Sequence, residues 1–224
     1  MRLARTIAPL VGLLLTAALV SPAGAGVHAA ASNQAIFSAG LIAASDVPAG
    51  WTPSKQADSG AKDYRGISAC KQLVSAIDGL RKGGPRKLSP TFTDDTSPNR
   101  LTSAADTVYV FKSTGAASKA VNALKAAPAP NCLAQVAKKG GGPQTTADVA
   151  DISSALQGAG DDQLGYEVTV HATDQSGGQV TALLDIVVVR VGRAVLGFDF
   201  ANQDARLPQA PAIVNAVVNR VANA

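Results

Sequence analysis

The sequence predicts an α+β domain in which helices pack as a sandwich on a twisted, mainly antiparallel sheet held by one disulfide. The chain has 224 residues, of which 46% are hydrophobic and only 16% charged, so it can bury a sizeable core. Apolar spacings typical of helices occur in its first two thirds, and strand-like alternation follows before a final helix. This composition excludes a disordered tail and a fibrous repeat.

Residues 1–29 are typical of a secretory signal peptide. Arg2 and Arg5 precede an apolar segment over 7–20, which leads into a run of small residues. An uncleaved membrane anchor would need about 18 unbroken apolar residues. The segment is shorter, so a cleaved peptide is the better interpretation.

Cleavage is expected after Ala25 or Ala29. No cysteine lies near this junction to accept a lipid. We therefore expect one domain over 30–224 that is secreted or extracytoplasmic, without a lipid anchor. No later apolar run reaches spanning length, so no transmembrane segment is expected in the mature chain.

The first expected elements of the mature chain are two helices separated by a loop. Residues 33–51 begin with a helix-like apolar stretch and end in a turn that contains Pro and Gly. Residues 53–65 are polar and predict a loop. A second helix is expected from Ser68, a favourable N-cap, to the Gly-Gly-Pro at 83–85. Its apolar face consists of Cys70, Leu73, Val74, Ile77 and Leu80.

The middle of the chain predicts short strands and two further helices. A turn-rich stretch with a short strand at 91–93 leads to a strand over 106–112, which is rich in β-formers. A helix with one apolar face follows between Gly115 and Pro128. Asn131 is expected to cap a short helix that carries the second cysteine.

The C-terminal part predicts an antiparallel meander and a last helix. Residues 147–156 form a weak strand, and 164–172 alternate as a strand with one solvent-facing side. Residues 179–191 are apolar on both faces, which indicates a strand covered on both sides. A strand over 194–200 and a helix over 208–221 complete the chain.

Cys70 and Cys132 are the only cysteines. In an exported chain they are expected to form one disulfide, which closes a loop of 62 residues and stabilises the fold by about 4 kcal/mol. A metal site or a catalytic thiol would need partner residues near each cysteine, and the sequence offers none.

The charge balance is small. The formal net charge is +4, and loss of the two signal-peptide arginines leaves about +2. The basic residues Arg81, Lys82, Arg86 and Lys87 are interrupted by Gly-Gly-Pro, so they predict a solvated helix end and turn. No nucleic-acid partner is expected.

Catalytic motifs are absent from the sequence. It contains no Gly-x-Ser-x-Gly elbow, no His-Glu-x-x-His helix and no P-loop. His171 is the single histidine of the mature chain, and Glu167 lies about 13 Å from it along an extended strand. We therefore predict no catalytic residue, no metal site and no cofactor, and a protein that is not an enzyme.

Three residues are the candidates for lining a ligand-binding cleft: Trp51, Asp185 and Arg190. Asp185 lies in an apolar strand, where it either pairs with Arg190 or Arg193 or lines a cleft. Trp51 follows a Pro- and Gly-containing turn, where it either plugs the core or lines the mouth of a cleft.

The chain combines the element Asp46-x-Pro48-x-Gly50-Trp51, a helix with Cys70, a strand and helix from Val108 to Leu124, a second cysteine and Val189-Arg190-Val191-Gly192. Together these features resemble the secreted or extracytoplasmic sensor-like domains of actinobacteria. This group includes the extracellular domain of mycobacterial receptor Ser/Thr kinases and free-standing lipoproteins of a partly PsbP-like fold. The resemblance covers roughly residues 35–223 and implies a cleft-bearing ligand-binding or sensing module. The chain differs in having no kinase, no transmembrane helix and one disulfide instead of two.

These observations favour a non-enzymatic ligand-binding or sensor-like domain of the bacterial cell envelope, with a small or lipidic envelope ligand as its partner. One alternative is an envelope protein–protein interaction module. Another is a hydrolase with an unrecognised site, for which the base would have to be His171 or an acid.

Overall fold

The computed structural model describes residues 27–57, 61, 63–96, 101–142, 144–173 and 177–224. It shows an open, eight-stranded antiparallel sheet and five helices, which confirms the predicted α+β class. The strand order is β1-β3-β4-β8-β7-β6-β5, and β2 pairs with β4. The elements are α1 (Val27–Gly40), β1 (Trp51–Ser54), α2 (Lys71–Gly83), β2 (Arg86–Leu88), β3 (Thr91–Asp94), β4 (Thr102–Val110), α3 (Thr114–Ala126), α4 (Ala129–Gly141), β5 (Thr146–Asp151), β6 (Asp162–Thr173), β7 (Gln179–Val191), β8 (Ala194–Gln203) and α5 (Ala210–Ala222).

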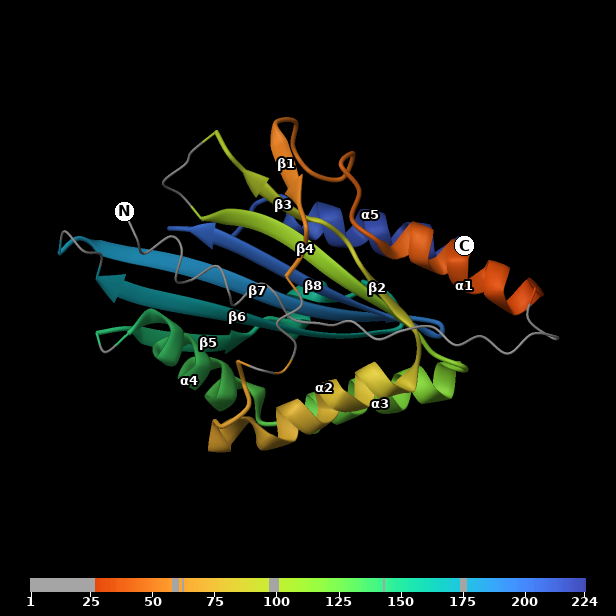
Figure 1. Cartoon of the computed structure of the whole chain (residues 1–224), viewed down its shortest axis with the longest axis horizontal. Coiled ribbons are helices and arrows are strands. Elements are labelled where there is room, and N and C mark those ends of the chain that lie inside the picture. Colours follow the sequence, from red (N-terminus) through yellow and green to blue (C-terminus); the bar gives the residue numbers. More distant parts are fainter. Residues whose placement is uncertain (1–26, 58–60, 62, 97–100, 143, 174–176) are drawn as a thin grey trace.

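Helices cover both faces of the sheet (Figure 1). The helices α2, α3 and α4 lie on one face, and α1 and α5 lie on the other. The central strand β7 is apolar on both sides because it contacts both layers. Leu184 faces the α2–α4 layer, whereas Val187 and Val189 face α1 and α5. The expectation that this strand is covered on both sides is confirmed.

The expected disulfide is present. Cys70 ends a short 3₁₀ turn (Ser68–Cys70) before α2, and Cys132 lies in the first turn of α4. Both side chains are completely buried. The bond therefore ties the start of one helix of the layer to the start of another, beneath their outer surface.

Two edge strands were not expected from the sequence. The strand β1 lies at the start of the predicted loop, and β2 lies where the basic residues predicted a turn. Neither has a strand-like sequence; Pro53 lies within β1, opposite Phe92 of β3. Pairing with β3 and with β4 supplies their backbone hydrogen bonds, so tertiary contacts override the local preference.

Two expected helix caps are wrong. Ser68 does not cap α2; its hydroxyl makes no capping hydrogen bond, and the 3₁₀ turn precedes the helix. The helix α4 begins at Ala129, before Asn131, whose side-chain oxygen accepts a hydrogen bond from Gln135 Nε2 at 3.2 Å inside the helix. Pro130 lies in the first turn of α4, where its missing N–H has no helical partner to lose, so the helix starts earlier.

The predicted signal peptide lies outside the described residues as far as residue 26, and α1 begins at Val27. None of the helices in the described part of the chain combines the length and apolarity needed to cross a bilayer.

Candidate functional site

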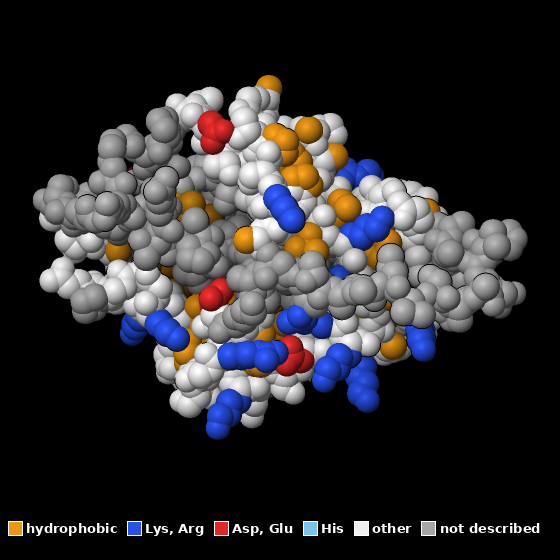
Figure 2. Space-filling model, viewed as in Figure 1, with side chains coloured by type: hydrophobic (Ala, Val, Ile, Leu, Met, Phe, Trp, Pro, Cys, Tyr) orange, Lys and Arg blue, Asp and Glu red, His pale blue; other side chains and the backbone are white. Residues whose placement is uncertain are grey.

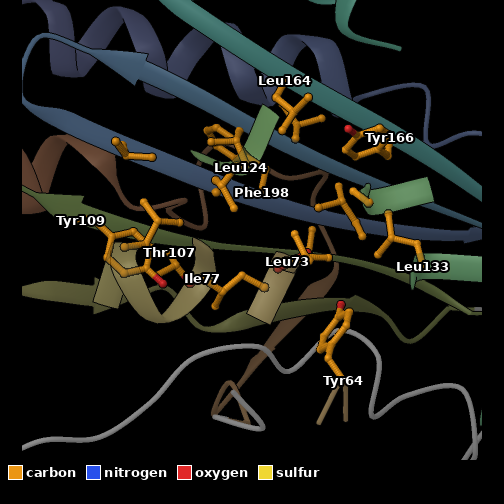
Figure 3. Close-up of a pocket in the computed structure, with 18 residues that line it drawn as sticks. Tyr64, Leu73, Ile77, Thr107, Tyr109, Leu124, Leu133, Leu164, Tyr166 and Phe198 are labelled. Carbon is orange, nitrogen blue, oxygen red and sulfur yellow. The ribbon is translucent and has the colours of Figure 1, made fainter. Parts of the chain in front are cut away.

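A cavity of about 100 Å³ lies between the sheet and the α2–α4 layer (Figure 3). Its walls consist of side chains that the regular repeats of the helices and strands turn toward the cavity. The apolar stripe of α2 points inward at every third or fourth residue, and alternate residues of β4, β6, β7 and β8 point toward it. The apolar walls include Leu73, Ile77, Leu124, Leu133, Leu164 and Val195.

The cavity exists partly because β8 has a glycine where its neighbours have side chains. Gly197 lies between Val195 and Asp199 on the strand face that borders the cavity. A Cβ atom built on Gly197 would meet only the carbonyl oxygen of Thr107, at 3.9 Å. The space that a side chain would fill at this position is therefore open.

Polar atoms interrupt the apolar lining on the sheet side. Thr107 and Tyr109 of β4 are each 1% exposed. Thr107 Oγ1 has no hydrogen-bond partner among the described residues, whereas the Tyr109 phenol interacts with Arg86. Tyr64, which is also buried, and Tyr166 add two further phenol groups (Figure 3). An unpaired buried hydroxyl costs roughly 1–3 kcal/mol, so a ligand group that hydrogen-bonds Thr107 Oγ1 within the cavity would recover part of this cost.

Asp199 is the acidic residue among those that line this cavity. It is half-buried and borders the main cavity and an adjoining one of about 20 Å³ toward α4. Desolvation raises the pKa of its carboxyl to about 7, and repulsion from Asp106 adds to the shift. At neutral pH a large share of Asp199 is therefore protonated and able to donate a hydrogen bond. Its charge in turn contributes to the raised pKa of Tyr64, which burial dominates.

Asp106 lies on the opposite face of the sheet, under α1. Its Oδ1 accepts a hydrogen bond from the backbone N–H of Ile42 at 2.9 Å, while Oδ2 has no partner in the described part of the chain. Burial raises the pKa of Asp106 to about 7, although hydrogen bonds from Ile42 and Ser89 and the charge of Arg220 oppose the shift. Two acids in adjacent strands are thus held toward their neutral forms.

Asp199→Asn is expected to change how stability depends on pH. Between about pH 4 and pH 7 the unfolded chain loses the proton of Asp199 and the folded protein keeps it, so the free energy of unfolding falls as pH rises through this window. Asparagine is neutral in both the folded and the unfolded state, so the variant lacks this contribution to the decrease in the free energy of unfolding. Urea unfolding at a series of pH values should show the variant gaining stability over wild type as pH increases. Parallel profiles for the two proteins would contradict the assignment, and Asp148→Asn, which removes an exposed acid of β5, is the control.

The structure does not bring the three cleft candidates together. Asp185 does not pair with Arg190 or Arg193; it pairs with Arg206, whose Nε lies 3.1 Å from Asp185 Oδ2. Arg206 also binds Glu167, the residue opposite Asp185 on β6, at 2.9 Å. Arg206 can reach back over the two acids because it follows β8, which pairs with β7.

Arg190 and Trp51 lie elsewhere. Arg190 Nη1 donates to Asp161 Oδ2 at 2.9 Å and to the carbonyl oxygen of Gly192 at 3.2 Å, so it fastens the β7–β8 turn. Trp51 is half-buried at the start of β1, where it packs on the α1/α5 side of the core and lines an outer groove of about 310 Å³.

Sequence reasoning missed Asp199, Thr107 and Gly197. The signal that singled out Asp185, an acid within an apolar strand, is equally present in Phe198-Asp199-Phe200. His171, the one imidazole considered for catalysis, is exposed and its Nδ1 lies 3.1 Å from Thr181 Oγ1. Within the described ranges, no three His, Cys, Asp or Glu side chains are grouped so that they could hold a metal ion.

The fold and this cavity define a class: an α+β protein with an open antiparallel sheet, covered on both faces, and an apolar cavity under one helical layer. No protein-family model matches the chain, and no curated protein matches its sequence. Among solved structures, the chain is similar to the crystal structure of the extracellular domain of PknH from Mycobacterium tuberculosis. The TM-score is 0.47 with 10% sequence identity, over 70% of this chain and 76% of that chain. The partly PsbP-like fold and the actinobacterial grouping stay predictions.

Proposed function

We propose that this chain is an extracytoplasmic, non-enzymatic ligand-binding domain of the cell envelope. It holds a small apolar molecule, or the apolar end of a larger one, that carries one neutral hydrogen-bonding group. The observation that carries the proposal is the pair of polar groups in an otherwise apolar cavity: Asp199 and the unpaired hydroxyl of Thr107. Ligand sites combine apolar walls with a few such convergent polar groups.

The size of the cavity limits the ligand. A dry apolar cavity of roughly 150 Å³ holds benzene, so about 100 Å³ accepts a molecule of similar or smaller size. A longer amphiphile would place only one end here. The hydrogen-bonding group of the ligand should be neutral, because an anionic group would be repelled by Asp199 or Asp106 when either acid is ionised.

Two further observations support a binding role outside the cytoplasm. The cavity walls contain hydroxyls and one acid, but neither a histidine nor a cysteine that could pair with a hydroxyl as base or nucleophile. The buried disulfide favours an oxidising compartment.

Gly197→Val tests the proposal because it fills the cavity at a position with free space. The probes are straight-chain primary alcohols from butanol to octanol, which combine an apolar chain with one hydroxyl. They are expected to raise the unfolding midpoint of the wild-type protein, because a ligand that binds only the folded state stabilises it. The valine variant should fold normally, since valine suits a strand, and should show no such rise.

Gly79→Ala is the matched control, since a Cβ atom at this position of α2 meets nothing within 4 Å and lies outside the cavity. It should respond to the alcohols as wild type does. Amide chemical shifts in an NMR titration would locate the alcohol at Gly197. Equal stabilisation of the valine variant, or shifts confined to the outer groove at Trp51, would overturn the proposal.

A further inference from the structure

The outer surface of the α2–α4 layer is strongly basic. These three helices contain a single acid, Asp78, against seven lysines and arginines. Their apolar stripes face the sheet, so the charged side chains point outward. Figure 2 shows Lys and Arg side chains along the lower edge of the molecule, over these helices. The basic residues of this face, called here the basic helix face, are Lys71, Arg81, Lys82, Lys119, Lys125, Lys138 and Lys139.

Most of this charge is not neutralised within the protein. Asp78 contacts Arg81 and Arg65, and Lys125 forms an ion pair with Asp162 of β6. The other five lysines are exposed and form no ion pair with any residue that the structure describes. The whole chain has a formal charge of only +4, so the remainder of the molecule is close to neutral or acidic and the charge is concentrated on one side. The five lysines are Lys71, Lys82, Lys119, Lys138 and Lys139.

We propose that the basic helix face docks on the surface of an anionic lipid bilayer. Separate lysines spread over a helical layer suit a plane of phosphate groups, since each ammonium is a flexible point charge that can find its own partner. A single-stranded nucleic acid would need exposed aromatic side chains for stacking. The aromatics packed under this layer are all buried: Tyr64, Tyr109, Phe111 and Tyr166. This proposal is independent of whether the cavity binds a ligand.

The test uses the exported form of the protein and vesicle sedimentation. The vesicles contain phosphatidylcholine alone or with an equal amount of phosphatidylglycerol. Binding is expected only to the anionic vesicles, and it should be lost between about 0.1 M and 1 M salt, where the screening length falls from roughly 10 to 3 Å. The double variant Lys138→Gln/Lys139→Gln should weaken partitioning by roughly 25-fold, about fivefold for each lysine removed.

The matched control is Lys55→Gln/Lys87→Gln, which removes the same charge away from the basic helix face. Lys55 follows β1, and Lys87 contacts Gln34 and Phe37 of α1 on the other side of the sheet. This variant should bind vesicles within about twofold of wild type, whereas long-range attraction by net charge alone would weaken both variants equally. The proposal is overturned by equal loss in the two variants, by equal binding to neutral vesicles, or by capture on a DNA duplex without binding to anionic vesicles.

Discussion

Replacing Cys70 and Cys132 together by alanine is expected to lower the free energy of unfolding by about 4 kcal/mol. The disulfide closes a loop of 62 residues, which contains α2, α3 and the strands β2 to β4. Its loss therefore increases the conformational entropy of a large part of the unfolded chain. Urea unfolding followed by circular dichroism measures the change, and the thermal midpoint should fall by roughly 10 °C.

The same measurement on the reduced wild-type protein provides the comparison. It should resemble the double variant, and reductant should have no effect on the double variant itself. Loss of the bond should also loosen α2 relative to α4, because the bond joins the residue just before α2 to the first turn of α4. An unfolding free energy within about 1 kcal/mol of wild type would show that packing alone holds the helix layer.

Arg220→Ala is expected to lower the free energy of unfolding by about 3 kcal/mol. Arg220 of α5 binds both carboxylate oxygens of Asp46, at 2.6 and 2.8 Å, and donates to the carbonyl oxygens of Ala39 and Leu41 at 3.0 Å each. The Asp46 side chain is only 6% exposed, so the alanine variant leaves a nearly buried carboxylate without its partner. The substitution also detaches the end of α1 from α5.

Arg220→Lys tests whether this contact depends on positive charge alone or also on the planar geometry of the guanidinium. Lysine keeps the positive charge but cannot form the paired hydrogen bonds of a guanidinium, so it should recover less than half of the loss. A second comparison combines Arg220→Ala with Asp46→Asn. The double variant should be more stable than the sum of the two single effects predicts, because the asparagine leaves no buried charge. Simple additivity would show that Arg220 and Asp46 are not coupled.

The helices and the long strands were predictable from the sequence because their patterns are local. The stripe of α2 and the alternation along β6 each reflect which side of one element meets the core, and a period of 3.6 or 2 reveals this without knowledge of the partner. The continuous apolar run of β7 likewise indicates contact with the core on both sides. The disulfide was predictable because a pair of cysteines has one possible pairing. The short edge strands β1 and β2 were not, because their only support is the neighbouring strand.

The site was less predictable than the fold. Asp185 stood out as an acid in an apolar strand, but its partner Arg206 comes from the segment after β8, which no local pattern connects to it. Asp199 carries the same signal, yet its role depends on which side of β8 faces the α2–α4 layer and on the missing side chain at Gly197. Of the basic helix face, only Arg81 and Lys82 belong to the basic cluster at 81–87 of the sequence; the other members are spaced along three separate helices, so no local pattern groups them all.

By itself, the sequence determined the class of fold, the single cross-link, the order of the long elements and the residues that form each apolar face. These depend on hydrophobic burial along one element at a time. Only the tertiary structure decided where the cavity lies, which polar groups it contains, how the buried acids are partnered and where the positive charge gathers. These features arise between residues far apart in the chain, and they are set by which elements the sheet topology brings together.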